Sequence, residues 1–307
     1  AWLTFSAAHL AGHQFWDLSQ LAQAPTGRER ELLQRALEDV YAEVDAAFGR
    51  VLAALPGDCD VIVASAVGMD VNSSRADLLP QMLEAVLSGG PLPADGDGGG
   101  GAGAIWRLRA AIPPGARGAI ARALPDRAAL ELTARLELRG IDWSQTAAFC
   151  HPADNQGYIR LNLRGRERDG IVDPSEADEL LRVIAAGLAT FRDPDGAPAV
   201  ASVDRVAEHH AGARADQLPD LVVQWSERPA TTLAGVHSAS FGDVLRRGTG
   251  SGRSGNHTPG DAWAVVAPGS HAARSPGRAP RLADVASTVA AVCGVDGDGL
   301  AGESLLG

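Results

Sequence analysis

The sequence predicts an α/β protein with a mostly parallel central sheet and helices on both of its faces. Short runs of apolar, β-branched residues alternate along the chain with longer segments that have the 3.6-residue period of amphipathic helices. In addition, 307 residues of which 45% are hydrophobic are enough to bury a sizeable core.

The first part of the chain supplies strands and helices in alternation. Residues 2–6 predict a short strand, followed by a loop with two histidines. Residues 29–55 predict an amphipathic helix, because their apolar side chains recur at spacings of three or four. The apolar run over 60–65 predicts a buried strand, and 78–87 predict another helix.

The middle of the chain differs in composition and suggests three segments. Glycine, proline and aspartate dominate residues 88–104, which predict a flexible loop. Residues 105–140 are rich in arginine and predict a helical insertion. We therefore divide the chain into a first part of the α/β core (1–87), a loop with its insertion (88–150), and the remainder of the core (151–307).

The last segment returns to alternating strands and helices. Its predicted elements are a half-buried strand over 158–163, a helix over 175–191, buried strands over 220–225 and 262–267, and a final helix over 282–293. Ser175 is the expected N-cap of the first of these helices, since serine accepts from the free N–H groups of a first turn. Gly294 is expected to close the final helix.

Composition excludes several classes of function. The chain has 27 basic and 38 acidic residues, and every basic one is an arginine. Without lysine there is no phosphate-loop lysine and no Schiff base. The net charge of −11 argues against nucleic acid as a bulk partner. No apolar run reaches the roughly 18 residues of a membrane span, and no signal sequence opens the chain, so we expect no membrane partner and a cytoplasmic location.

Three histidines are the candidate metal ligands. His9 and His13 are four residues apart, which places both imidazoles on one face if the segment is helical. His257 lies in a glycine-rich stretch, expected to be a loop, just before a predicted strand, where α/β proteins often place functional groups. From spacing alone, surface or capping roles for these histidines stay open.

Several motifs give the chain a family resemblance. The string from His9 to Trp16 resembles the metal-binding loop of the alkaline phosphatase superfamily, in its bacterial type I phosphodiesterase and nucleotide pyrophosphatase-like branch. Further segments are similar to motifs of this branch in the same order: 41–45 with 61–69, 157–174, 219–223, and 255–260 with the strand and helix that follow. The resemblance spans nearly the whole chain.

The resemblance implies a fold, a reaction and a cofactor. The fold is an alkaline-phosphatase-like α/β core, and the activity is metal-dependent hydrolysis of phosphoric esters, as in phosphodiesterases, nucleotide pyrophosphatases or phosphohydrolases. The family holds two divalent metals, commonly zinc, and uses a threonine or serine nucleophile on small phosphorylated substrates. Metal ions would supply the positive charge in this chemistry, which is compatible with the absence of lysine.

The chain departs from the family pattern at its ligands. His9 stands where the family usually has aspartate, and Ala66 and Val67 replace an Asp-His ligand pair. The family's first strand and nucleophile would precede residue 1, so we assign no catalytic residue. One metal site at most is expected, formed by His9, His13 and His257. Asp70 could substitute in the second site or serve as a loop or cap carboxylate.

These departures leave alternatives to the enzyme. The chain is either a phosphoric-ester hydrolase, a degenerate non-catalytic member or fragment that acts as a binding protein, or a module that binds a single zinc ion. Function depends on the site rather than on the fold, so the sequence does not choose among them.

Overall fold

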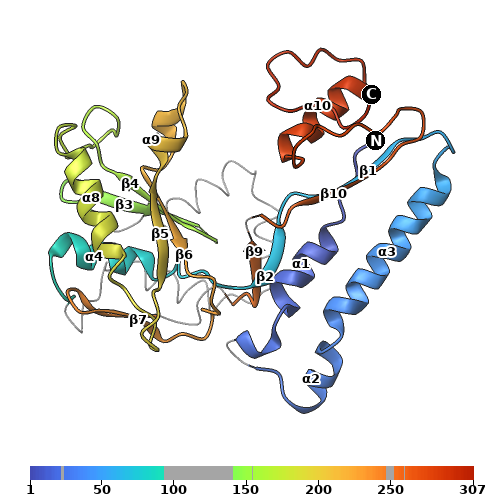
Figure 1. Ribbon diagram of the computed structural model, residues 1–307. Coiled ribbons are helices and arrows are strands. Elements are labelled where there is room, and N and C mark those ends of the chain that lie inside the picture. Colours follow the sequence, from blue (N-terminus) through green and yellow to red (C-terminus); the bar gives the residue numbers. More distant parts are fainter. Residues whose placement is uncertain (22–23, 93–140, 154, 247–251, 259) are drawn as a thin grey trace, which may run out of the picture. The chain divides into compact units, whose positions relative to one another are not determined.

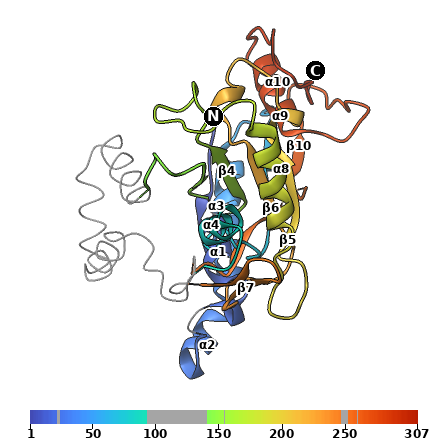
Figure 2. The same cartoon turned by 90° about the vertical axis from the view of Figure 1, so that its left-hand side faces the viewer.

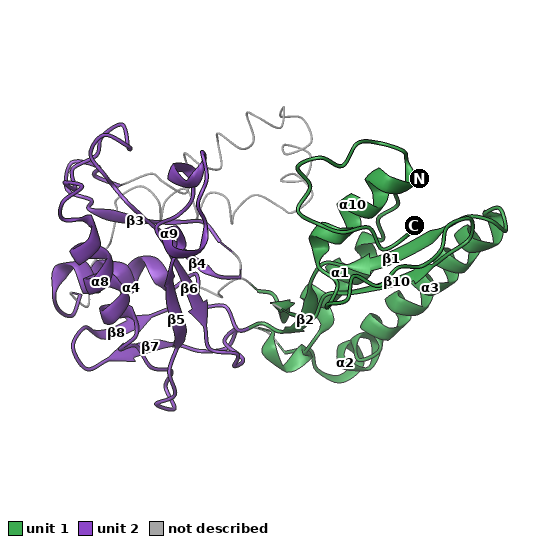
Figure 3. Cartoon of the chain, turned by 45° about the horizontal axis from the view of Figure 1, so that its top comes forward, with its two compact units in different colours: residues 1–72, 252–307 green, residues 73–251 purple. Residues whose placement is uncertain are grey.

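The computed structural model describes residues 1–21, 24–92, 141–153, 155–246, 252–258 and 260–307 (Figure 1). The chain forms two compact units, which Figure 3 colours separately: unit 1 contains residues 1–72 and 252–307, and unit 2 contains residues 73–251. Most of the predicted glycine-rich loop and all of the predicted helical insertion lie outside the described residues. The segment boundaries after residues 87 and 150 stay predictions.

Unit 1 has helices from both ends of the chain. They are α1 (Ser6–Phe15), the 3₁₀ helix η1 (Leu18–Gln20), α2 (Gly27–Leu33), α3 (Ala36–Ala54) and α10 (Leu282–Val292). The single helix predicted over 29–55 is thus two helices, with the break at Gln34 and Arg35. The strand predicted over 2–6 was wrong, because Ser6 begins α1 and residues 2–5 pair with no strand in the described part of the chain.

Two antiparallel pairs complete unit 1. Strand β1 (Val61–Ser65) pairs with β10 (Trp263–Ala267), and β2 (Gly68–Val71) pairs with β9 (Gly255–Thr258). Strands were therefore correctly predicted near 60–65 and 262–267. Their burial was not, since Trp263 and Val265 are 53% and 57% exposed. Both strands of a two-stranded ribbon are edge strands. They are therefore not buried on both faces, as the central strands of a wide parallel sheet are.

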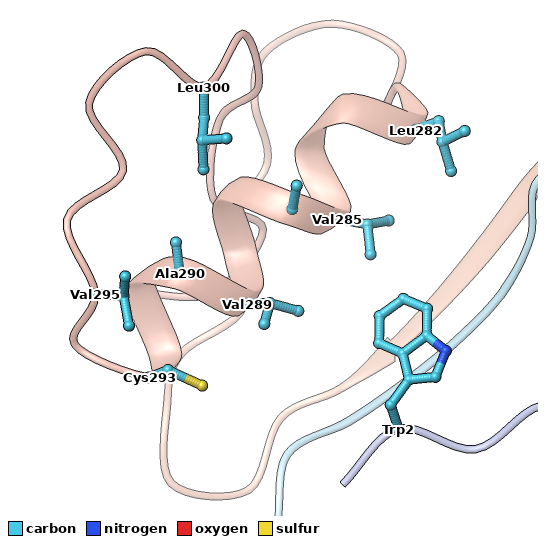
Figure 4. Close-up of a pocket in the computed structure, with 9 residues that line it drawn as sticks. Trp2, Leu282, Val285, Val289, Ala290, Cys293, Val295 and Leu300 are labelled. Carbon is cyan, nitrogen blue, oxygen red and sulfur yellow. The ribbon is translucent and has the colours of Figure 1, made fainter.

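An apolar groove runs beside α10 in unit 1. Its walls come from that helix, from Trp2 and from the segment after the helix, and it encloses about 570 Å³ (Figure 4). Gly294 ends α10 as predicted: it has a φ of +63°, and its N–H donates to Ala291 O. No helix among the described residues is long and apolar enough to cross a membrane. The cytoplasmic location stays a prediction.

Unit 2 packs helices against a four-stranded sheet (Figure 2). Its helices are α4 (Leu79–Ser88), α8 (Ala177–Leu188), α9 (Val206–His209) and the 3₁₀ helix η2 (Ala215–Gln217); its strands are β3 (Ala148–His151), β4 (Gly157–Leu161), β5 (Val200–Arg205), β6 (Leu221–Trp225), β7 (Gly235–Ser238) and β8 (Gly242–Leu245). The fully buried side chains of Met82, Ile159, Ile184, Leu188 and Leu221 join α4 and α8 to the sheet in one core. Burial of such side chains stabilises a fold by about 1.5–3 kcal/mol each.

The predicted fold class was wrong. Every pair of named strands in the described residues is antiparallel, and these strands form four small sheets instead of one parallel sheet with helices on both faces. The expected strand–helix–strand crossover does occur, since β4, α8 and β5 follow one another and β4 and β5 run in the same direction. However, β6 lies between them and pairs antiparallel with both. Hydrophobic period locates strands but does not give their partners.

The start of α8 also differs from the prediction. The helix begins at Ala177, and Ser175 is not its N-cap. Instead, the backbone N–H and hydroxyl of Ser175 both donate to Asp173 Oδ1, at 2.9 and 2.6 Å. The carboxylate of Asp173 accepts both hydrogen bonds and so stabilises a turn just before the helix.

Asp60 fastens the ends of β1 and β10 together. Its carboxylate accepts from His271 Nδ1 at 2.6 Å and from Gly269 N at 2.8 Å. The His271 side chain, followed by the Gly269 N–H, holds the pKa of Asp60 well below its usual range. Both partners lie just after β10, so this carboxylate connects segments more than 200 residues apart in sequence.

Replacement of Asp60 by asparagine is expected to make the stability of unit 1 less dependent on pH in acid. A carboxylate with a lowered pKa in the folded state stabilises the fold above about pH 4, and this contribution is lost as the pH falls further. The difference in free energy of unfolding between wild type and Asp60→Asn should therefore shrink below about pH 4. Urea denaturation from pH 7 to pH 3 measures it, and a constant difference would contradict the assignment.

Candidate metal centre

Helix α1 brings two of the predicted ligands together. His9 and His13 are one turn apart on it, and their ring centroids are 4.7 Å apart in an edge-to-face arrangement. His13 is buried, whereas His9 is exposed to solvent. As predicted from their spacing of four residues, the two imidazoles lie on one face of a helix. One of them is buried in the protein and the other is at its surface.

The third predicted ligand comes from the far end of the chain. His257 lies on strand β9 and not on a loop, which corrects the prediction; its register partner on β2 is Met69. Its ring centroid lies 4.9 Å from those of both His9 and His13. Figure 1 shows α1 beside β2 and β9, so the helix and this antiparallel pair of strands together build the cluster.

Close backbone packing seats α1 on β9. Gly12 faces the side chain of Met69, and a Cβ built on Gly12 would lie 3.0 Å from the terminal methyl of that residue. Gly255 is tighter still, because a Cβ there would lie 2.3 Å from Gly12 O. The N–H of Ser254 donates to His13 O at 2.8 Å. Glycines at both positions therefore let the helix approach the strand closely enough to bring the imidazoles together.

The backbone also orients the buried imidazole. His13 Nδ1 lies 2.9 Å from Gly255 O in a buried hydrogen bond. A carbonyl oxygen can only accept, so Nδ1 carries the proton and donates, and the lone pair is on Nε2. A backbone carbonyl that fixes the tautomer in this way is the usual outer partner of a metal-binding histidine.

The distances fit a metal ion. One ring nitrogen from each of His9, His13 and His257 lies within 4.8 Å of the others. His9 Nδ1 and His257 Nε2 are 3.3 Å apart. Tetrahedral zinc with Zn–N bonds of ~2.0–2.1 Å separates two ligand nitrogens by about 3.3–3.4 Å. The three histidines therefore form a cluster that can hold a metal ion.

The surroundings of His9 favour its neutral imidazole. The pKa of His9 lies below its ordinary value, first because the ring is partly desolvated and then because of His13 and Arg253 nearby. Neutral imidazole is the form that binds a metal. The three members of the cluster are all histidines. Neutral imidazoles carry no negative charge, so they would not offset the positive charge of a bound divalent ion.

Asp70, the substitute considered for a second site, does not belong to this cluster. Asp70 Oδ1 accepts from Trp16 Nε1 at 3.1 Å and from Val71 N at 2.6 Å, as a local loop or strand carboxylate does. Ala66 and Val67 offer no ligand atom, and Val67 is exposed. The described residues contain no other group of three or more potential ligands with this geometry.

The other histidines have separate surroundings. His209 and His210 are exposed, as expected for solvated residues. His237 pairs with Asp243 at 2.7 Å on the β7–β8 hairpin. The pairing of His271 with Asp60 was missed by sequence reasoning. It could have been found only from the pairing of β1 with β10, which brings the start of one strand to the end of the other.

Comparison of the chain with protein-family models, with curated proteins and with solved structures finds no match. The resemblance to the alkaline phosphatase superfamily therefore rests on the sequence motifs alone.

The carbonyl that orients His13 gives a test of the site. With zinc as the probe ion, we expect Gly255→Ala to weaken any metal binding by the cluster about 10-fold or more, as loss of an outer-shell partner does, because the new Cβ would push Gly12 and β9 apart. Titration against a chromophoric zinc chelator measures the effect. Gly49→Ala in α3 is the matched control, since a Cβ there meets no atom within 4 Å. Equal affinities for Gly255→Ala and wild type would contradict this role of Gly255.

Proposed function

We propose that the chain binds one divalent metal ion, zinc, through His9, His13 and His257 and hydrolyses phosphoric esters of small substrates. The observation that carries the proposal is the convergence of the three ring nitrogens within 4.8 Å. Three protein ligands with a fourth position open are the arrangement of many hydrolytic zinc sites.

The donor set favours zinc among the common divalent ions. Imidazole nitrogen suits zinc and other transition metals, whereas magnesium and calcium prefer oxygen ligands. A zinc ion in this position would supply a Lewis acid for a phosphoryl oxygen. His13 is the fixed ligand, held by Gly255 O, and His9 is the ligand on the exposed side. Substrate would therefore approach from the side of His9.

The proposed reaction, hydrolysis of phosphoric esters, rests on the sequence motifs that resemble those of the alkaline phosphatase superfamily. The strings around His9 and His257 are those that also supply the cluster. No nucleophile is assigned to a residue of the chain. The proposal therefore concerns a centre with one metal ion and does not extend to the two-metal mechanism of that family.

A second candidate is a non-catalytic binding protein. The observation that favours it is the pair Ala66 and Val67, which leaves the position of the family's second metal without two ligands. Such a protein would retain the three-histidine site and bind a phosphorylated ligand without cleaving it.

Metal content and turnover together test both candidates. Protein purified with zinc and dialysed should retain one zinc per chain by elemental mass spectrometry. It should also hydrolyse bis-p-nitrophenyl phosphate, and a chelator should abolish that activity while re-added zinc restores it. One zinc per chain without turnover would replace the enzyme with the binding protein. Protein that keeps no zinc would refute both.

A further inference from the structure

Helix α10 of unit 1 is attached to the protein by polar side chains. Its two fully buried residues are Asp284 and Thr288. The Arg278 guanidinium donates to both carboxylate oxygens of Asp284, at 2.7 and 2.9 Å. The hydroxyl of Thr288 donates to Asp284 O at 2.6 Å and accepts from Leu305 N at 2.8 Å. A surface helix normally has the opposite arrangement, with its apolar face in the core.

The apolar face of α10 is instead exposed in the groove (Figure 4). Leu282 on the helix is 64% exposed, and Trp2, which lines the same groove, is 76% exposed. Val289, Val295 and Leu300 add three more exposed apolar side chains. Soluble monomers rarely expose a contiguous apolar surface of this kind, and such a surface marks a site that another molecule covers.

The two ends of this apolar face carry opposite charges. Arg281 immediately precedes α10 and is exposed; its Nη2 donates to Ala301 O at 2.9 Å. Asp296 and Asp298 lie at the other end, just after Val295, and both are exposed. Among the described residues, neither the arginine nor either aspartate forms an ion pair. An α-helix of 11 residues separates the two ends by about 16 Å.

We infer that this face is the interface of a homodimer, in which α10 of one copy packs antiparallel against α10 of a second copy. A twofold axis brings the same surface of both copies face to face, so the start of each helix meets the end of the other. Arg281 of each copy is then opposite Asp296 and Asp298 of the other copy. The apolar side chains form the centre of the interface and exclude water, and the ion pairs form its rim.

The charge pattern selects a second copy among the possible occupants. A parallel arrangement of the two helices would place Arg281 against Arg281, and like charges disfavour it. An anionic lipid surface would be repelled by Asp296, by Asp298 and by the net charge of −11. The inference uses no residue of the metal centre, so it is independent of the proposed function.

Sedimentation equilibrium of the full chain tests the inference. At micromolar concentrations, wild type should sediment with twice the mass of one chain. Val289→Glu places a carboxylate without a partner in the apolar centre of the interface and should raise the dissociation constant of the dimer at least about 100-fold. Val183→Glu on α8 of unit 2 is the matched control, because Val183 and Val289 are 41% and 40% exposed. It should leave the dissociation constant unchanged.

Three outcomes would overturn the inference. The first is a wild type that stays monomeric at all concentrations tested. The second is a Val289→Glu variant that dimerises as tightly as wild type, with circular dichroism showing that both are folded. The third is a monomeric wild type that sediments with vesicles of neutral phosphatidylcholine, which would assign the groove to lipid.

A charge exchange tests the antiparallel arrangement without any change in the apolar face. Arg281→Asp places like charges at both ends of the interface and should weaken the dimer about 10-fold or more. The double variant Arg281→Asp with Asp298→Arg restores an opposite pair across the twofold axis. Its dissociation constant should lie between those of Arg281→Asp and wild type. A double variant as weak as Arg281→Asp would contradict this arrangement of the helices.

Discussion

His13→Ala should abolish zinc binding at micromolar concentrations. The substitution removes the buried ligand on α1, whose Nδ1 donates to Gly255 O. Two remaining histidines, one of them exposed, do not make a three-ligand site. We expect the affinity to fall by at least about 100-fold, the size of effect that even outer-shell partners of metal ligands can reach. Competition with a chromophoric chelator measures this affinity.

The matched control for that experiment is His210→Ala. His210 is exposed in unit 2 and is not a member of the cluster, so zinc affinity should not change. Circular dichroism of both variants at 25 °C tests whether the fold survives, and His9→Ala provides a second ligand variant at the protein surface, where no buried cavity is left. Zinc binding by both His9→Ala and His13→Ala with wild-type affinity would refute the centre.

Asp193→Ala should destabilise unit 2 by about 3–5 kcal/mol, the cost of leaving a buried charge without its partner. Arg75 is completely buried, and its Nε donates to Asp193 Oδ1 at 2.9 Å while Nη2 donates to Oδ2 at 2.5 Å. The remaining donor, Nη1, contacts the carbonyls of Ser73 and Ser226. Without Asp193, the guanidinium would keep its charge in a site closed to water.

Urea denaturation followed by circular dichroism measures the loss. Asp195→Ala is the control, because Asp195 pairs with Arg228 on the surface and such exposed pairs contribute about 0–1 kcal/mol. Hydrogen exchange in α4 and β6 assigns the change to unit 2. Equal stabilities of Asp193→Ala and Asp195→Ala would show that the buried pair does not stabilise the unit.

The positions of helices and strands followed largely from hydrophobic period. The strands near 60–65 and 220–225, the helix near 78–87 and the C-terminal helix lie close to where their apolar spacing predicted. Hydrophobic period failed at residues 2–5, which have no partner strand among the described residues, and at Gln34, where one continuous pattern covers a break between two helices. The failure at residues 2–5 has a physical reason. A strand is stable only when it pairs with another strand, and a local sequence pattern does not show whether a partner exists.

Strand direction and the details of the centre were beyond the sequence. The insertion of β6 between β4 and β5 depends on contacts across the sheet, not on any local signal. The i, i+4 spacing correctly predicted that the imidazoles of His9 and His13 are neighbours, and the glycine-rich context drew attention to His257 as a third candidate ligand. The backbone carbonyl of Gly255 could not be predicted, since every residue has one and only the packing of α1 selects it.

The placement of β9 sets an order of events for the making of this protein. His13 and the carbonyl that orients it are 242 residues apart in sequence, and all of unit 2 is inserted between them. Unit 2 is continuous, so its core can form while the rest of the chain is still being synthesised. The centre must wait for residues 252–258 to emerge and must then close a very long loop, at an entropic cost that grows only slowly with length. Acquisition of a metal ion would thus mark the last stage of maturation, and a chain cut short before His257 would be left without it.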